Sequence, residues 1–269
     1  MLESVPQLRT ESVVIPEETY GYSGVAFGGY VAGLLARRSP PVAGMQVDFK
    51  RPAPLGIPVE ITTDGAGGEI ADAQGPLAVA RPADVTLDVP SPPTWEEALA
   101  ATSEYLTEAP IPQPNCFGCG PDRRKGTGLR QFLGLVPGRP LIAAAWIPDA
   151  ALGDHDGTLP VELTWAALDC PGGVAKTRLT DSSGPAFTAY LAASLFESVA
   201  VGERHVALGW PISRTGRKTV VGSALVTADG RLCARAQALV NASATRSSAA
   251  CRSRTFASTT RRQASLASW

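Results

Sequence analysis

Residues 27–37 read Phe-Gly-Gly-Tyr-Val-Ala-Gly-Leu-Leu-Ala-Arg, and this stretch sets the kind of fold that the first half of the chain can form. Its apolar residues recur at helical spacing, and the arginines at its end suit the negative end of a helix dipole. Because the stretch is apolar on almost every side, we expect a buried helix. Residues 45–50, Met-Gln-Val-Asp-Phe-Lys, then alternate apolar and polar side chains, which predicts a strand with one buried face.

Further strands are predicted in both halves of the chain. In the first half, alternation recurs at residues 57–61 and 85–89, which favours an antiparallel sheet. In the second half, a helical stretch over about 158–170 comes before the expected strands. These strands are residues 187–196, 206–210, 219–227 and 232–240. Asp229-Gly230 predicts a two-residue hairpin between the last two strands. A helix followed by strands thus occurs twice, which indicates a weak internal duplication.

Proline marks the boundary between the two expected units. Six prolines between residues 90 and 114 bracket a short helix, in which Thr94 and Glu97 have the spacing of a capping box. The expected units are an N-terminal domain over residues 1–89, a Pro-rich linker with a short helix over 90–114, and a C-terminal domain over 115–241. Residues 242–269 carry five arginines and no acid, which predicts a flexible basic Ser/Arg tail.

The composition gives no sign of a nucleic-acid or membrane partner. Of the 269 residues 44% are hydrophobic, and 24 basic against 25 acidic residues give a formal net charge of −1. No broad basic surface is therefore expected. No apolar run approaches the ~20 residues of a spanning helix, and the start of the sequence lacks a signal-peptide pattern. We therefore expect a cytoplasmic protein.

Several motifs resemble a known family. Residues 26–30, Ala-Phe-Gly-Gly-Tyr, look like the Gly-Gly start of the central helix in hotdog thioesterases, and residues 47–59 are similar to their second strand. Residues 115–122, Asn-Cys-Phe-Gly-Cys-Gly-Pro-Asp, resemble the opening of a thioesterase-like hotdog subgroup and are the most specific of these motifs. With Trp165–Pro171, the resemblance extends over roughly residues 20–240. The chain is similar to the double-hotdog acyl-CoA thioesterases of the thioesterase superfamily.

This resemblance implies an α+β fold and an activity. Two hotdog domains, each a long central helix wrapped by an antiparallel sheet, would form an intrachain pseudo-dimer. The implied reaction is hydrolysis of the thioester of an acyl-CoA or a related acyl thioester, with no metal or redox cofactor. The resemblance also allows a homo-oligomer of double-hotdog units.

The resemblance further implies the roles of individual residues. Hotdog thioesterases use a carboxylate on the central helix as base or nucleophile, and Asp169 matches that position. Gly28 and Gly29 would face it as backbone donors to the oxyanion, although glycines here also suit close packing of helix on sheet. No acid lies between residues 21 and 38, so only one of the two pseudo-symmetric sites is expected to hold a carboxylate. Phe27, Tyr30 and Trp165 are expected to contact the substrate.

The alternative for Asp169 is a structural one. The residue could be a helix-end aspartate satisfied by backbone or solvent, because Pro171 and two glycines follow and are expected to interrupt the helix. A carboxylate that faces a cleft would favour an enzyme, and one that points into solvent would favour a non-catalytic module that binds acyl-CoA or lipid. A third reading is a structural protein that interacts through its outer sheet face.

The cysteines do not predict a metal site from their spacing. Cys116 and Cys119 form a single Cys-x-x-Cys, and a structural zinc ordinarily needs a second pair, whereas Cys170 and Cys233 stand alone in the sequence. A structured turn at residues 116–119 is therefore expected, with no bound metal. Cys170 could be a nucleophile activated by a base, but a buried small apolar thiol is favoured.

Overall fold

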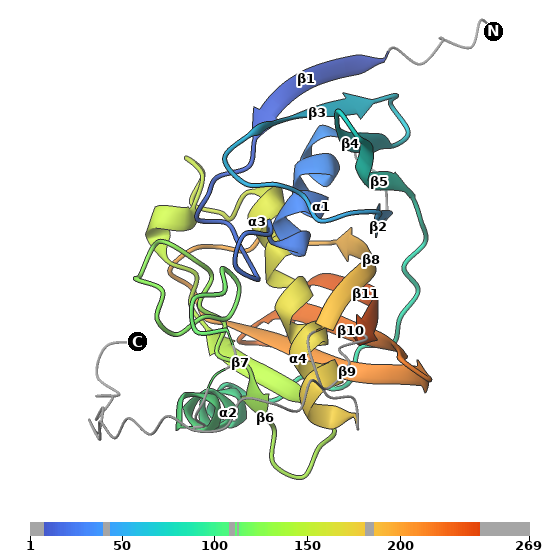
Figure 1. The fold of residues 1–269 in the computed structure, drawn as a ribbon. Coiled ribbons are helices and arrows are strands. Elements are labelled where there is room, and N and C mark those ends of the chain that lie inside the picture. Colours follow the sequence, from blue (N-terminus) through green and yellow to red (C-terminus); the bar gives the residue numbers. More distant parts are fainter. Residues whose placement is uncertain (1–7, 40–43, 108–110, 112, 181–185, 243–269) are drawn as a thin grey trace, which may run out of the picture.

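The computed structural model describes residues 8–39, 44–107, 111, 113–180 and 186–242 (Figure 1). The predicted tail, residues 242–269, lies outside this part except for its first residue. Within the described residues the strands form an 11-stranded antiparallel sheet, in the order β1-β3-β4-β5-β2-β8-β11-β10-β9-β7-β6. The strands are β1 Arg9–Val14, β2 Met45–Phe49, β3 Pro58–Thr63, β4 Gly68–Asp72, β5 Gly75–Pro82, β6 Gly134–Leu135, β7 Ile142–Trp146, β8 Ala186–Leu195, β9 His205–Thr215, β10 Lys218–Thr227 and β11 Leu232–Ala242.

Two halves of the sheet meet at one pair of strands. β2 from the first half pairs with β8 from the second, with Met45 opposite Ala193 and Asp48 opposite Tyr190. Residues that are 142 to 148 positions apart in the sequence therefore become neighbours across one ladder of hydrogen bonds. The expected antiparallel sheet is confirmed, and it is continuous from β1 to β6.

Three helices line the middle of the molecule. They are α1 Gly28–Arg38, α3 Val161–Ala167 and α4 Asp169–Leu179. Helix α1 packs on α3 and on strands β2, β4 and β5, whereas α4 packs on β7 to β11 (Figure 1). The expected buried helix at residues 27–37 is confirmed, because Val31, Ala32 and Leu35 are almost fully buried against the sheet.

The sheet has a second core on its other face. Helix α2, Trp95–Thr107, packs on β6 and β7 and buries Ala98 and Ala101 against Leu208 and Val226. The capping box that begins α2 is confirmed: the Glu97 N–H donates to Thr94 Oγ1 at 3.2 Å, and the Thr94 N–H donates to Glu97 Oε2 at 2.8 Å.

The strand expected at residues 85–89 is wrong. This segment is irregular, and β5 at Gly75–Pro82 provides the strand instead. Val85 is buried, and Leu87 and Val89 pack on the second core. The alternation therefore reflects an extended segment with one covered side, which has no neighbouring strand to complete a ladder of backbone hydrogen bonds.

The single helix expected over about 158–170 is also wrong, because the chain breaks at Leu168 between α3 and α4. In a continuous helix Pro171 could not donate to the carbonyl of Ala167, and its ring would clash with that turn. With the break, Pro171 lies in the first turn of α4, where no intrahelical donor is needed. Ser223 Oγ donates to the Leu168 carbonyl at 2.6 Å and satisfies it. Asp169 consequently begins a helix and does not end one.

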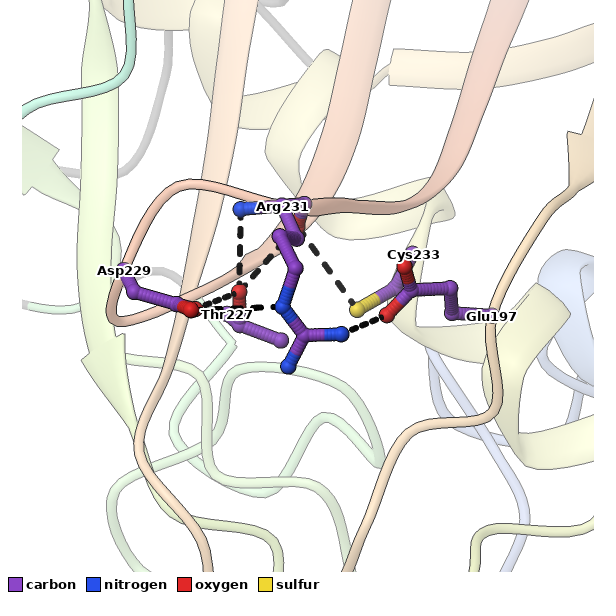
Figure 2. Close-up of polar contacts among 5 residues, drawn as sticks. All are labelled: Glu197, Thr227, Asp229, Arg231 and Cys233. Carbon is purple, nitrogen blue, oxygen red and sulfur yellow. Dashed lines mark hydrogen bonds and ion pairs between the residues drawn. The ribbon is translucent and has the colours of Figure 1, made fainter.

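The last hairpin has a longer loop than the expected two residues. β10 ends at Thr227 and β11 begins at Leu232, with Gly230 at a φ of +87°. Figure 2 shows that Arg231 forms an ion pair with Asp229 in the same loop and another with Glu197, which follows β8. The buried Cys233 lies beside it, with its thiol 3.9 Å from the Arg231 carbonyl oxygen.

No helix in the described ranges combines the length and apolar character that a membrane span requires.

Candidate active site

A cavity of about 1140 Å³ lies where the start of α1, the start of α4 and strand β8 come together. Its walls are largely apolar. The apolar side chains include Phe27, Val31, Phe49, Val174, Phe187 and Val240. Asp169 is the one carboxylate among the described residues that line the cavity, so a single acid faces a mainly hydrophobic space.

Asp169 is held by hydrogen bonds from two other elements. Thr188 Oγ1 on β8 donates to Asp169 Oδ1 at 2.9 Å, and the Gly29 N–H on α1 donates to Asp169 Oδ2 at 2.9 Å. Each carboxylate oxygen thus has one donor, which fixes the plane of the carboxylate. What remains exposed of this side chain faces the cavity.

The surroundings of Asp169 favour its neutral form. Burial raises the pKa of the Asp169 carboxyl above its usual value, because the charged form loses the solvation that water would supply. The hydrogen bonds from Thr188 and Gly29 oppose this rise by stabilising the carboxylate. Raised carboxyl pKa values inside a cavity are typical of catalytic acids and bases.

The two glycines at the start of α1 have different environments. Because the Gly29 N–H already donates to Asp169, the expectation that it serves as a free oxyanion donor needs correction. Gly28 lines the cavity, and no described residue accepts a hydrogen bond from its N–H. A Cβ on Gly28 would lie 3.2 Å from Asp169 Oδ2. The Gly28 N–H and the Asp169 carboxylate therefore lie at the same end of the cavity.

The glycines also allow close packing of the helices, as the alternative reading held. A Cβ on Gly29 would lie 2.8 Å from Ala166 Cα, and one on Gly33 would lie 2.3 Å from Glu162 Cα. Such distances are too short for real contacts, so α1 and α3 approach as they do because these positions lack side chains. At Gly29 both readings hold together, because the same close approach brings its N–H to Asp169.

Only one of the three expected substrate-contacting side chains lines the cavity among the described residues. Phe27 does so, but Tyr30 and Trp165 do not. Tyr30 is half-buried and packs edge-on against Phe117, and Trp165 is buried in the core. In α1, Gly28 and Val31 line the cavity, whereas Tyr30 lies on another face of the same turn. Trp165 belongs to α3, and no described residue of that helix lines the cavity.

Two polar residues of the site were missed from the sequence. Thr188 and Asn241 lie on neighbouring strands β8 and β11, and both line the cavity. Asn241 Oδ1 is buried without a hydrogen-bond partner among the described residues. Both residues interrupt strands whose other residues are mostly apolar. A polar residue at a position expected to be buried is the sequence feature that could have identified them as site residues.

Three cysteines meet at the same cavity. Cys116 and Cys119 from the loop before β6 and Cys170 from the first turn of α4 place their sulfur atoms within 4.8 Å of one another. The expectation that Cys170 stands alone is therefore wrong. Hydrogen bonds from the Cys119 and Cys170 thiols lower the pKa of Cys116, and the same interactions with Cys116 raise the pKa of Cys170.

Solved structures share this arrangement of the chain. A candidate thioesterase II from Thermobifida fusca YX is 17% identical, the match covers 88% of this chain and 96% of that chain, and the TM-score is 0.57. A conserved protein with a hot dog fold from Alicyclobacillus acidocaldarius is 16% identical over 88% and 94% of the two chains, with a TM-score of 0.56. The acyl-CoA thioesterase II TesB2 from Mycobacterium marinum is 13% identical over 86% and 92%, with a TM-score of 0.54.

No protein-family model matches the sequence, and no curated protein matches it either. At identities this low, the likeness to solved structures establishes the fold. The resemblance expected from the sequence is confirmed at that level: the chain has the hotdog fold found in structures of thioesterases.

Proposed function

We propose that this protein hydrolyses the thioester bond of an acyl-CoA or a related acyl thioester, with Asp169 as the catalytic carboxylate. The observation that carries the proposal is the position of Asp169. It is a partly buried acid with a raised pKa, it faces a large apolar cavity, and it is oriented by Thr188 and Gly29. A carboxylate that faces a cleft, and not the solvent, favours an enzyme over a non-catalytic binding module.

In the proposed reaction Asp169 acts as a general base. Its carboxylate takes a proton from a water molecule while the water oxygen attacks the thioester carbonyl carbon. The Gly28 N–H, at the positive end of α1, donates to the oxygen on which negative charge develops. When the tetrahedral intermediate collapses, the carbon–sulfur bond breaks, and the proton held by Asp169 passes to the leaving thiolate.

The cavity fits the two ends of such a substrate. Its apolar walls suit an acyl chain, and Lys50 and Arg51 also line it. Arg51 pairs with Asp72 at 2.6 Å, whereas Lys50 is exposed. These cations would attract the phosphate groups of coenzyme A.

We also propose the finer organisation of the fold. Residues 1–89 and 115–241 would be two hotdog domains that form an intrachain pseudo-dimer, and residues 90–114 would join them. The paired strands β2 and β8 and the packing of α1 on α3 support this division (Figure 1). In this arrangement Asp169 belongs to the second domain and Gly28 and Gly29 to the first, so the site would form where the two domains meet.

The test is a thiol-release assay with a panel of acyl-CoA substrates that ranges from short to long and aryl acyl groups. We expect release above the background rate for at least one member, with saturation at increasing substrate concentration. Calorimetric titration with the same panel runs in parallel. Binding of a panel member with no release by the folded protein would contradict the proposal and support the non-catalytic acyl-CoA or lipid-binding module.

Thr188→Val should shift the pH dependence of turnover. The substitution removes the hydroxyl that donates to Asp169 and keeps the shape of the side chain. Without this donor the pKa of Asp169 rises further, so the acid limb of the pH–rate profile should move to higher pH. Loss of a hydrogen bond to a charged group costs about 1.5 kcal/mol, equivalent to roughly a tenfold fall in kcat at a fixed pH on the acid limb, whereas the high-pH plateau should change little.

Thr219→Val is the matched control for this prediction. Thr219 is a buried strand threonine on β10, and its hydroxyl has no hydrogen-bond partner among the described residues. The control should keep both the rate and the pH profile. A Thr188→Val profile that coincides with the wild-type profile would show that Thr188 does not act through Asp169.

A further inference from the structure

We propose that Cys116, Cys119 and Cys170 bind a zinc ion as three thiolate ligands, with the fourth ligand taken from the cavity. The proposal is independent of thioester hydrolysis, because it rests on the cysteine cluster alone. The three side chains come from two segments that are 51 residues or more apart in the sequence, and all three are buried.

The distances between the sulfur atoms fit tetrahedral coordination of a zinc ion. Zinc binds thiolate sulfur at about 2.3 Å, and two ligands at tetrahedral corners are then about 3.8 Å apart. The Cys116 and Cys170 sulfurs are 3.8 Å apart, and all three lie within 4.8 Å of one another. Movements of side-chain size would bring the third sulfur to the same separation.

The surrounding chain is built to hold these sulfurs close together. A Cβ on Gly118 would lie 2.4 Å from the Cys170 sulfur, so the loop lets Cys170 approach only because residue 118 is glycine. The Gly120 N–H donates to the Cys116 carbonyl at 2.9 Å, which closes the turn. Tyr105 Oη, from α2, donates to the Cys119 carbonyl at 3.0 Å and fixes the other end of the turn.

The remaining coordination position is available to a ligand from the cavity. All three cysteines line it, whereas the oxygens of the neighbouring Asp169 already accept hydrogen bonds from Thr188 and Gly29. Three protein ligands with one exchangeable position are typical of zinc sites that bind a small molecule, and thiolates select zinc over magnesium or calcium. Each thiol releases its proton on binding, so the affinity should rise with pH.

The experiment titrates Co²⁺, as a spectroscopic substitute for Zn²⁺, into the reduced full-length protein after treatment with a chelator. We expect a thiolate-to-cobalt charge-transfer band that saturates at one ion per chain and disappears when Zn²⁺ is added. Zinc should also protect three thiols from alkylation. Absence of the band in folded wild-type protein, or alkylation at the same rate with and without zinc, would overturn the proposal.

Variants locate the site. Loss of a residue that only hydrogen-bonds to a metal ligand lowers metal affinity by up to roughly 100-fold. Cys116→Ser and Cys119→Ser remove a ligand itself, so each should lower cobalt affinity by more than that. Cys233→Ser is the matched control, because Cys233 is equally buried but lies beside Arg231 at the far hairpin (Figure 2). It should retain the band. A band that survives unchanged in a folded Cys116→Ser variant would also overturn the assignment.

Discussion

Asp169→Asn is expected to lower turnover of the best acyl-CoA substrate by about 10²- to 10⁴-fold, the usual cost of losing a general base. The amide keeps the shape of the side chain and can satisfy its neighbours. Its oxygen can accept from the Gly29 N–H, and its nitrogen can donate to Thr188 Oγ1, whose hydroxyl rotates. The charge that would activate water is lost while the local hydrogen bonds remain. The measurement is kcat per folded molecule.

The same substitution should leave stability unchanged or raise it at neutral pH. Burial places the folded-state pKa of Asp169 above its unfolded value. Asp169 therefore favours folding when protonated, and that contribution is lost as the pH rises through the folded-state pKa. Asparagine is uncharged at every pH, so the variant avoids the free-energy cost of burying a charged carboxylate at neutral pH. Thermal unfolding of the variant and the wild type at neutral pH tests the sign.

Asp48→Asn is the matched control for the loss of charge. Asp48 lies on β2, accepts a hydrogen bond from Gln46 Nε2 at 2.8 Å, and is not among the described residues that line the cavity. We expect unchanged turnover and a stability change within about 0.5 kcal/mol. Full activity of Asp169→Asn would rule out Asp169 as the base and direct attention to Cys170, which also lines the cavity.

Gly33→Ala should destabilise the fold by about 1–3 kcal/mol or more, because a methyl group would meet backbone atoms. The new Cβ would lie 2.3 Å from Glu162 Cα and 2.7 Å from the Glu162 carbonyl oxygen. Since backbone cannot rotate away as a side chain can, α1 and α3 must separate. Urea unfolding gives the change in stability, and kcat per folded molecule should also fall because Gly28 and Gly29 would move relative to Asp169.

Gly173→Ala controls for the general effect of replacing a helical glycine. Gly173 lies in α4, and a Cβ there would meet no atom within 4 Å. Alanine at such a site should stabilise the helix by roughly 0.5–1 kcal/mol. If Gly33→Ala were as stable as the wild type, the close approach of α1 and α3 would not depend on residue 33.

The elements that depend on local pattern were predictable from the sequence. The buried helix at residues 27–37, the strand at residues 45–50 and the capping box at Thr94 and Glu97 follow from periodicity and spacing. The structure confirms each, with the strand observed as Met45–Phe49. Asp169 could be selected as a candidate because it is the acid that matches the family's position. The hydrogen-bond partners of Asp169 could not be predicted, because nothing local in the sequence relates position 169 to position 29 or 188.

The tertiary structure decided what lies together. Pro171 breaks the expected helix at Leu168, and this break places Asp169 and Cys170 in the first turn of α4, facing the cavity. The pairing of β2 with β8 and the glycine-lined contact of α1 with α3 then bring residues from both halves to that turn. Secondary structure follows from interactions within a few residues. A site made of Gly29, Asp169 and Thr188, or of three cysteines from two segments, depends on packing between distant segments, which the spacing of residues along the chain does not encode.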